Sequence, residues 1–238
     1  MGSTPGPLVE IEVGDDPIAW ASLDFAVGDD GVTRIGHVDV RLAGAHDERG
    51  RGIVGWTLDA SAPAGDVDGL PTAYTVARHR AADRGAAPPV AHPNGVIGID
   101  HLVVMTPDLD RTTEALGAVG LEARRTREAG GGRRQRFFRL GEVILEVVGP
   151  ARPAGEGPAA FWGLALTVAD IDATAAHLAG RLSEPKAAVQ ADRRIAPLPP
   201  GHALPPPIAV RPPRTRREAR RVATEGESVS AMVTTARE

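Results

Sequence analysis

The strongest constraint on the fold is an internal repeat in the middle of the chain. Residues 164–174 repeat the pattern of residues 102–112, which begins 62 positions earlier. In each copy an apolar run of strand length leads into an Asp-x-Asp sequence, with x Leu or Ile, that is typical of a helix start. A repeat of this kind predicts two supersecondary units of one type, each of which buries a face against its neighbour.

The first copy predicts a complete order of elements. Residues 97–105 form an apolar run that predicts a buried strand, and the sequence Thr-Pro-Asp at 106–108 predicts the start of a helix that ends at Gly120. Residues 124–127 and 133–139 predict two polar strands, and residues 142–148 predict a buried closing strand. The order of the unit is therefore βαβββ. In the second copy, Gly180 provides the equivalent helix stop.

Changes in composition divide the chain into four parts. Residues 1–60 alternate apolar and polar positions, and Arg34–Val38 resembles Arg139–Val143, so this part is predicted to be a degenerate N-terminal βαβββ-like module. Residues 61–96 are rich in Ala, Pro, Gly and Asp and are interpreted as a linker. Residues 97–196 hold the repeat. Residues 197–238 are rich in Pro and Arg, a composition that predicts a disordered tail.

Charge and composition exclude several classes of function. The chain has 238 residues, a net charge of −4 and 3% aromatic residues, which gives no general case for binding nucleic acid or an anionic membrane. The basic run between Arg214 and Arg221 is a weak exception, because such a run can contact nucleic acid or acidic proteins. The absence of cysteine excludes disulfides and thiolate catalysis. With no secretory signal and no apolar stretch of membrane-spanning length, a cytoplasmic location is expected.

The first copy resembles one module of the vicinal oxygen chelate (VOC) superfamily, the group of glyoxalases, bleomycin-resistance proteins and extradiol dioxygenases. The resemblance is carried by the strand Asp-His-Leu-Val-Val at 100–104, the Asp-Leu-Asp helix start at 108–110 and the strand Leu-Glu-Val-Val at 145–148 before Gly-Pro. The segment that begins at Trp162 resembles the start of a partner module. The resemblance implies an α+β fold in which paired βαβββ modules form curved mixed sheets around a cleft that binds a small molecule. Because three units do not pair evenly, either a homodimer or an unusual internal pairing of the units is also expected.

The resemblance implies a metal site as well. Metal-dependent members use a His in the first strand and a Glu in the last strand of a module, and these positions match His101 and Glu146, with Glu146 also the candidate catalytic residue. An imidazole with a carboxylate suits Zn, Mn, Fe or Ni. The partner module departs from the pattern, because Gly163 stands at the position equivalent to His101. The proline-rich stretch 198–207 is also not expected to supply a central closing strand, since proline lacks the N–H donor. Two of the four ligands rarely hold a catalytic metal.

Each of these residues also has a purely structural explanation. His101 fits a satisfied core or cleft histidine, and Glu146 fits a cross-strand pair with Arg133, Arg134 or Arg136. The arginines between 124 and 139 fit either an anionic substrate or a solvated strand face, and the solvated face is favoured. Phe161 and Trp162 are expected to fill the core or line the cleft wall.

Two functions follow from this, with a third and weaker one. The first is a glyoxalase-like lyase, isomerase or dioxygenase in which His101 and Glu146 hold a divalent metal that binds a small oxygenated molecule. The second is a metal-free module of the same fold that only binds its ligand, which Gly163 favours. The third is an interaction protein that works through its basic tail.

The abrupt change after Ala196 motivates one more hypothesis. A shift of the reading frame there would replace the closing strands with residues rich in Pro and Arg. The second module would then lack its last strand.

Overall fold

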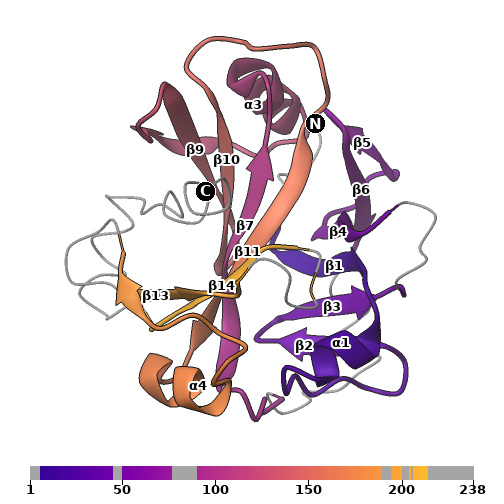
Figure 1. The fold of residues 1–238 in the computed structure, drawn as a ribbon. Coiled ribbons are helices and arrows are strands. Elements are labelled where there is room, and N and C mark those ends of the chain that lie inside the picture. The colour runs from indigo at the N-terminus through magenta and orange to yellow at the C-terminus, as the bar shows by residue number, and fades with distance from the viewer. Residues whose placement is uncertain are drawn as a thin grey trace.

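The strands of the protein form two sheets. The computed structural model describes residues 6–44, 50–76, 90–188, 194–199, 204 and 206–213, and all structural statements refer to these residues. The N-terminal sheet has six strands and the sheet built from the repeat has eight. Figure 1 shows the two sheets beside each other. No helix in the described ranges is long and apolar enough to cross a membrane.

The eight-stranded sheet consists of two βαβββ units. The first unit contains β7 (Val96–Met105), α3 (Leu109–Ala118), β8 (Ala123–Glu128), β9 (Arg133–Leu140) and β10 (Val143–Pro150). The second contains β11 (Ala160–Val168), α4 (Ile171–His177), β12 (Lys186–Ala187), β13 (Arg194–Pro197) and β14 (Ile208–Arg211). The strand order is β8-β9-β10-β7 in the first unit and β11-β14-β13-β12 in the second, and β7 pairs antiparallel with β11. The predicted α+β fold of paired βαβββ modules is confirmed.

The repeated Asp-x-Asp motif caps equivalent helices. Asp108 accepts hydrogen bonds from the backbone N–H groups of Asp110 and Arg111 at the start of α3. Asp170 accepts the same two bonds at the start of α4, from Asp172 and Ala173. These bonds satisfy N–H groups that have no partner inside the helix, which is why the motif recurs with the fold.

The closing strands of the second unit lie on either side of the proline-rich stretch. β14 begins directly after Pro207 and pairs in parallel with β11, while β13 pairs antiparallel with β14. The missing last strand that the reading-frame hypothesis implied for the second module is therefore not observed, since β14 occupies that place. The part of the predicted tail at 206–213 is ordered and includes β14. The described prolines of the stretch, Pro199, Pro206 and Pro207, lie between β13 and β14, outside both strands. The basic run from Arg214 lies outside the described residues.

The N-terminal sheet is a reduced form of the same pairing. It contains β1 (Leu8–Gly14), α1 (Pro17–Ala21), β2 (Val32–Ile35), β3 (Val38–Leu42), β4 (Gly52–Asp59), β5 (Gly65–Val67) and β6 (Leu70–Thr75). Its order is β2-β3-β1 followed by β4-β6-β5, with β1 and β4 antiparallel at the centre. The predicted boundaries of a single module at 1–60 and a linker at 61–96 therefore need correction, because β5 and β6 belong to the sheet. With two reduced units here, the argument for dimerisation from an uneven number of units no longer applies, and the homodimer stays a prediction.

The sequence echo between Arg34–Val38 and Arg139–Val143 marks equivalent hairpins. Ile35 pairs with Val38 at the β2–β3 turn as Leu140 pairs with Val143 at the β9–β10 turn. Gly36 and Gly141 adopt φ values of +62° and +72°, a conformation that favours glycine. The two turns lie close together, and His37 Nε2 is 3.3 Å from the Glu142 carboxylate.

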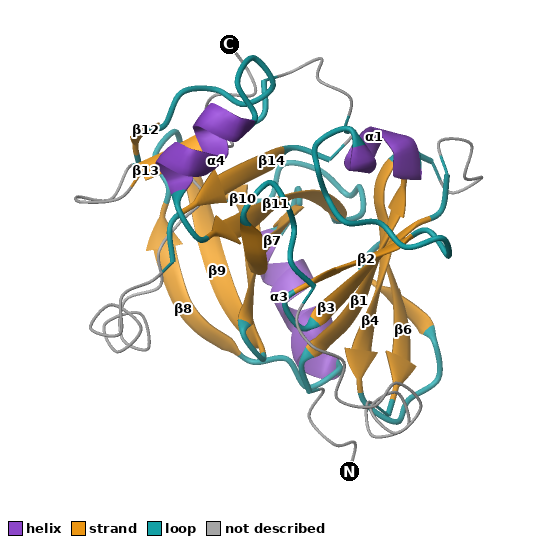
Figure 2. Cartoon of the chain, turned by 90° about the horizontal axis from the view of Figure 1, so that it is seen from below, coloured by secondary structure: helices purple, strands orange, loops and turns teal. Residues whose placement is uncertain are grey.

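One large core joins the two sheets. It contains Trp56 and Leu58 from the N-terminal sheet, Leu102 and Val104 from β7, and Leu116 from α3. The N-terminal sheet and the helices thus cover one face of the eight-stranded sheet, and Figure 2 shows the two sheets side by side with α3 between them.

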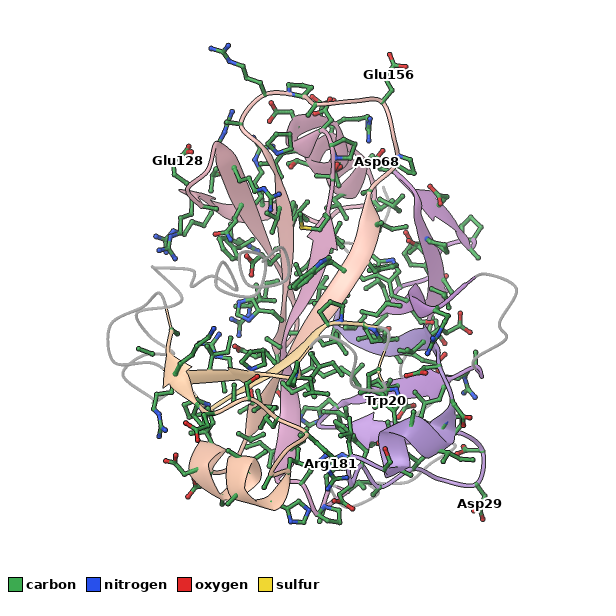
Figure 3. All side chains as sticks on the ribbon, in the orientation of Figure 1. Trp20, Asp29, Asp68, Glu128, Glu156 and Arg181 are labelled. Carbon is green, nitrogen blue, oxygen red and sulfur yellow. The ribbon has the colours of Figure 1, made fainter. Side chains whose placement is uncertain are left out.

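Polar contacts tie the sheets together at opposite ends of the molecule. Asp68, in the β5–β6 turn, accepts hydrogen bonds from Arg111 Nε at 2.8 Å and from Thr112 of α3. Asp24, which follows α1, contacts His177, the last residue of α4, at 3.0 Å. It also contacts Arg181, four residues after the end of α4, at 3.3 Å. Figure 3 shows Asp68 beside α3 and Arg181 at the other end of the molecule.

Candidate functional site

The candidate site lies on the face of the eight-stranded sheet opposite the large core, which we call the site face. Its position follows from strand register: His101 of β7 is paired with Ala165 of β11, and Ala165 is paired with Ala209 of β14. Glu146 of β10 is paired with Val103, two residues along the strand from His101, so both predicted site residues point to this face. Their side chains are completely buried.

A β-bulge in β7 adds a second polar side chain beside His101. The register steps from the pair Ala165–His101 directly to Leu166–Ile99, which leaves Asp100 as the extra residue. The Asp100 Oδ2 atom lies 3.0 Å from His101 Nδ1 and 2.7 Å from the guanidinium of Arg211 on β14. The strand after the proline-rich stretch therefore brings a cation to the site, next to a carboxylate that orients the imidazole.

The other imidazole nitrogen has no partner. Among the described residues, none forms a hydrogen bond with His101 Nε2. Asp100 provides a partner for Nδ1 only, and Nε2 is left without one. The interpretation of His101 as a fully satisfied core histidine therefore does not describe this ring.

Glu146 accepts a hydrogen bond from a neighbouring amide. Gln135 Nε2 on β9 donates to Glu146 Oε1 at 2.7 Å, and both side chains are buried. Arg134 and Arg136, two of the arginines considered as partners, contact Glu128 and Asp110 instead. Gln135 was not identified as a site residue from the sequence; its signal is a lone uncharged polar residue at an inward position of a strand otherwise rich in arginine.

The pseudo-symmetry of the two units tests whether this site fits a divalent metal. The counterparts of His101 and Glu146 in the second unit are Gly163, paired with Val103, and Ala209, paired with Ala165. A Cβ atom on Gly163 would lie 2.3 Å from the Pro207 carbonyl oxygen, so no side chain fits there. The described residues contain no group of three or more His, Cys, Asp or Glu placed to hold a metal ion. With half of the ligand positions empty and Arg211 nearby, the residue set does not fit a resident divalent metal.

The surroundings of these polar groups are apolar. Val103, Val148, Ala165, Ile195 and Ala209 form a small buried cluster on the site face, and Met105 and Trp162 pack against it, partly exposed. Trp162 thus lines the site face. Its neighbour Phe161 packs on Trp56 of the other sheet, with ring centroids 5.5 Å apart.

The arginines of β8 lie at the edge of the same face. Arg125 is paired with Phe137 and Arg127 with Gln135, and both are half-buried, whereas their neighbours Arg124, Thr126 and Glu128 are exposed. The favoured prediction of a solvated strand face therefore describes the outward-pointing positions of this strand and not Arg125 or Arg127.

Comparisons with known proteins add a likeness of fold. No family model and no curated protein matches the chain. Among solved structures, methylmalonyl-CoA epimerase from Mycobacterium tuberculosis is 20% identical over 55% of this chain and 97% of its own, with a TM-score of 0.44. A variant of the Streptomyces coelicolor methylmalonyl-CoA epimerase, in complex with 2-nitronate-propionyl-CoA, is 24% identical over 49% of this chain and 94% of its own, with a TM-score of 0.40. Likeness at this level assigns neither substrate nor reaction.

Proposed function

We propose that the protein binds a small oxygenated molecule on the site face without a resident divalent metal. The observation that carries the proposal is the pair of positions that correspond to His101 and Glu146 in the second unit. Gly163 has no room for a side chain and Ala209 has no ligand atom, so the second unit offers no metal ligand at these two positions and contributes the cation Arg211 instead.

The arrangement around His101 supports binding through hydrogen bonds. The buried ion pair between Asp100 and Arg211 balances the charge next to the ring, and the carboxylate holds the ring in one orientation. The unpartnered Nε2 atom then faces the site as a fixed hydrogen-bonding group. A fixed polar group in an apolar wall is the usual composition of a small-molecule site.

The competing function is the metal-dependent lyase, isomerase or dioxygenase, with His101 and Glu146 as metal ligands. A buried nitrogen with a free lone pair favours it, because such an atom is also a metal ligand. The metal-dependent function is disfavoured because only two of the four metal-ligand positions hold a ligating side chain.

Metal analysis separates the two functions. The chain is purified without a histidine tag, reconstituted separately with Zn, Mn, Fe and Ni, dialysed, and analysed for bound metal. The proposal predicts far less than one metal per chain in every case. Stoichiometric metal that is lost in His101→Ala would contradict it, and His37→Ala, at an exposed histidine outside the site, is the matched control.

A further inference from the structure

Two buried polar atoms of the site face lack hydrogen-bond partners among the described residues. They are His101 Nε2 and Gln135 Oε1, and both side chains have 0% exposure. Buried polar groups in proteins are nearly always hydrogen-bonded, because leaving one without a partner costs free energy. Two such atoms on one face of one sheet therefore indicate that something outside the described residues supplies their partners.

Both atoms are hydrogen-bond acceptors. Asp100 is paired with Arg211 and is therefore an ionised carboxylate, which only accepts, so the proton of the imidazole lies on Nδ1. In the neutral ring with its proton on Nδ1, Nε2 carries the lone pair and accepts. Gln135 uses its amide nitrogen to donate to Glu146, which leaves its oxygen as the free atom. The missing partners are therefore donors.

The two acceptors mark the ends of a diagonal row across three neighbouring strands. His101 is paired with Ile144, Glu146 follows two residues along β10, and Gln135 is paired with Val148 two residues further. With strands about 4.8 Å apart and a rise of about 3.3 Å per residue, the Cα atoms of His101 and Gln135 are roughly 16 Å apart. Val103 and Phe137, on the strands either side of β10, are paired with Glu146 and flank the middle of the row with apolar surface.

We propose that the ligand is an elongated molecule with an apolar body and a hydroxyl or amino group towards each end. One end donates to His101 Nε2 and the other to Gln135 Oε1, and the body lies along Val103 and Phe137. Gln135 is then a specificity-determining residue, because it rejects molecules that carry only acceptors at that end. This inference rests on the proposed metal-free function and names the ligand class of the same site.

Matched pairs of small molecules test the ligand class. ¹⁵N-labelled protein, first dialysed against a chelator, is titrated with 1,8-octanediol and with 4-(4-hydroxyphenyl)butan-1-ol, compounds whose two oxygens are spaced to span the row, and then with the dimethyl ether of each. The ring signals of His101 and the side-chain amide signals of Gln135 are followed by NMR. Each parent compound is expected to shift both sets of signals, and each ether is expected to bind at least about fivefold more weakly, as the loss of one or two hydrogen bonds implies.

Variants assign the effect to the two atoms. His101→Asn keeps a donor for Asp100 but removes Nε2, and Gln135→Met keeps the side-chain length but removes Oε1. Each is expected to weaken the binding of octanediol about fivefold. The control is Thr33→Val, which removes a buried hydroxyl that also lacks a partner but lies on β2 of the other sheet, and binding should not change.

Three results would overturn the inference: ethers that bind as tightly as their parents, parents that leave both residues unperturbed up to their solubility limit, or two folded variants that bind as the unmodified chain does. A failure of the proposed function is distinguishable from these, because it appears as stoichiometric metal in the elemental analysis whatever the ethers do.

Discussion

The two units of the eight-stranded sheet share one architecture but differ in their chemistry. Both have the same strand order, the same helix cap and the same place for the closing strand. On the site face, however, the first unit carries His101 and Glu146 where the second carries Gly163 and Ala209. The features that the units share are those on which folding depends, and the features that differ are those that would touch a ligand. The fold is thus maintained by caps and strand register, and these do not require the second unit to keep any site residue.

The largest expected effect concerns Arg211, a charged residue that the second unit contributes to the site. Arg211→Met leaves the buried Asp100 carboxylate without its guanidinium partner, and the free energy of unfolding is expected to fall by about 3 kcal/mol. Urea denaturation measures the change. The double variant Asp100→Asn, Arg211→Met should recover part of the loss, because the buried carboxylate and the guanidinium next to it are removed together.

An exposed pair of the same residue types provides the control for that result. Arg194 Nη1 lies 2.6 Å from Asp172, with both side chains largely in solvent, so Arg194→Met should change stability little. Equal losses of unfolding free energy in Arg211→Met and Arg194→Met would mean that the buried Asp100–Arg211 ion pair stabilises the fold no more than the exposed pair does.

The next effect tests why the second unit has no residue like His101. Gly163→Ala places a Cβ atom 2.3 Å from the Pro207 carbonyl oxygen and must displace the start of β14. We expect a loss of about 2 kcal/mol, typical of overpacking. Gly98→Ala is the matched control, because a Cβ there meets no atom within 4 Å. A stable Gly163→Ala variant would show that the position tolerates a side chain, so that lack of space would not explain the missing metal-ligating residue.

Smaller and equal effects are expected at the two caps. Asp108→Ala and Asp170→Ala each remove a carboxylate that accepts two backbone N–H groups, so each should cost about 1 kcal/mol in thermal or urea unfolding. Asp108→Asn and Asp170→Asn, which keep an acceptor, should cost much less. Clearly unequal losses would show that the repeated motif does not play the same part in both units.

The smallest expected effect is the pH dependence of stability that comes from His92, a buried histidine whose ring forms hydrogen bonds with the N-terminal part of the chain. His92 accepts from the Ala26 N–H through Nδ1, and its Nε2 lies 2.9 Å from the Arg34 carbonyl, so the neutral ring fills both bonds. Burial lowers the pKa of His92 below its ordinary value of 6.5. The folded chain therefore binds fewer protons there than the unfolded chain, and stability should fall as the pH drops below about 6.5.

Unfolding curves between pH 5 and pH 8 would measure this dependence. His92→Gln should flatten the curve, whereas His37→Gln, at a histidine whose side chain is 81% exposed, should not. A curve that keeps its slope in His92→Gln would assign the pH dependence to other groups.

The sequence predicted the twin units but not the whole site. The repeat at 102 and 164 was informative because capping and burial impose the same residues wherever the unit occurs. The closing strand β14 was missed because only four residues follow the prolines before the strand ends, too few for a periodic pattern. Asp100, Gln135 and Arg211 were missed because their partners are set by a bulge and by register between distant strands, and a linear pattern carries no information about either.

The contacts of Asp68 and Asp24 have a practical consequence for anyone who wishes to shorten the chain. These residues, at opposite ends, fasten the N-terminal sheet over the helices, and Trp56 seals the middle against Phe161. A truncated protein that starts at residue 97 would expose to water the apolar face of the eight-stranded sheet that the N-terminal sheet now covers. It would be prone to aggregate instead of folding autonomously. A shortened chain built around the eight-stranded sheet therefore has to retain the N-terminal sheet that covers it.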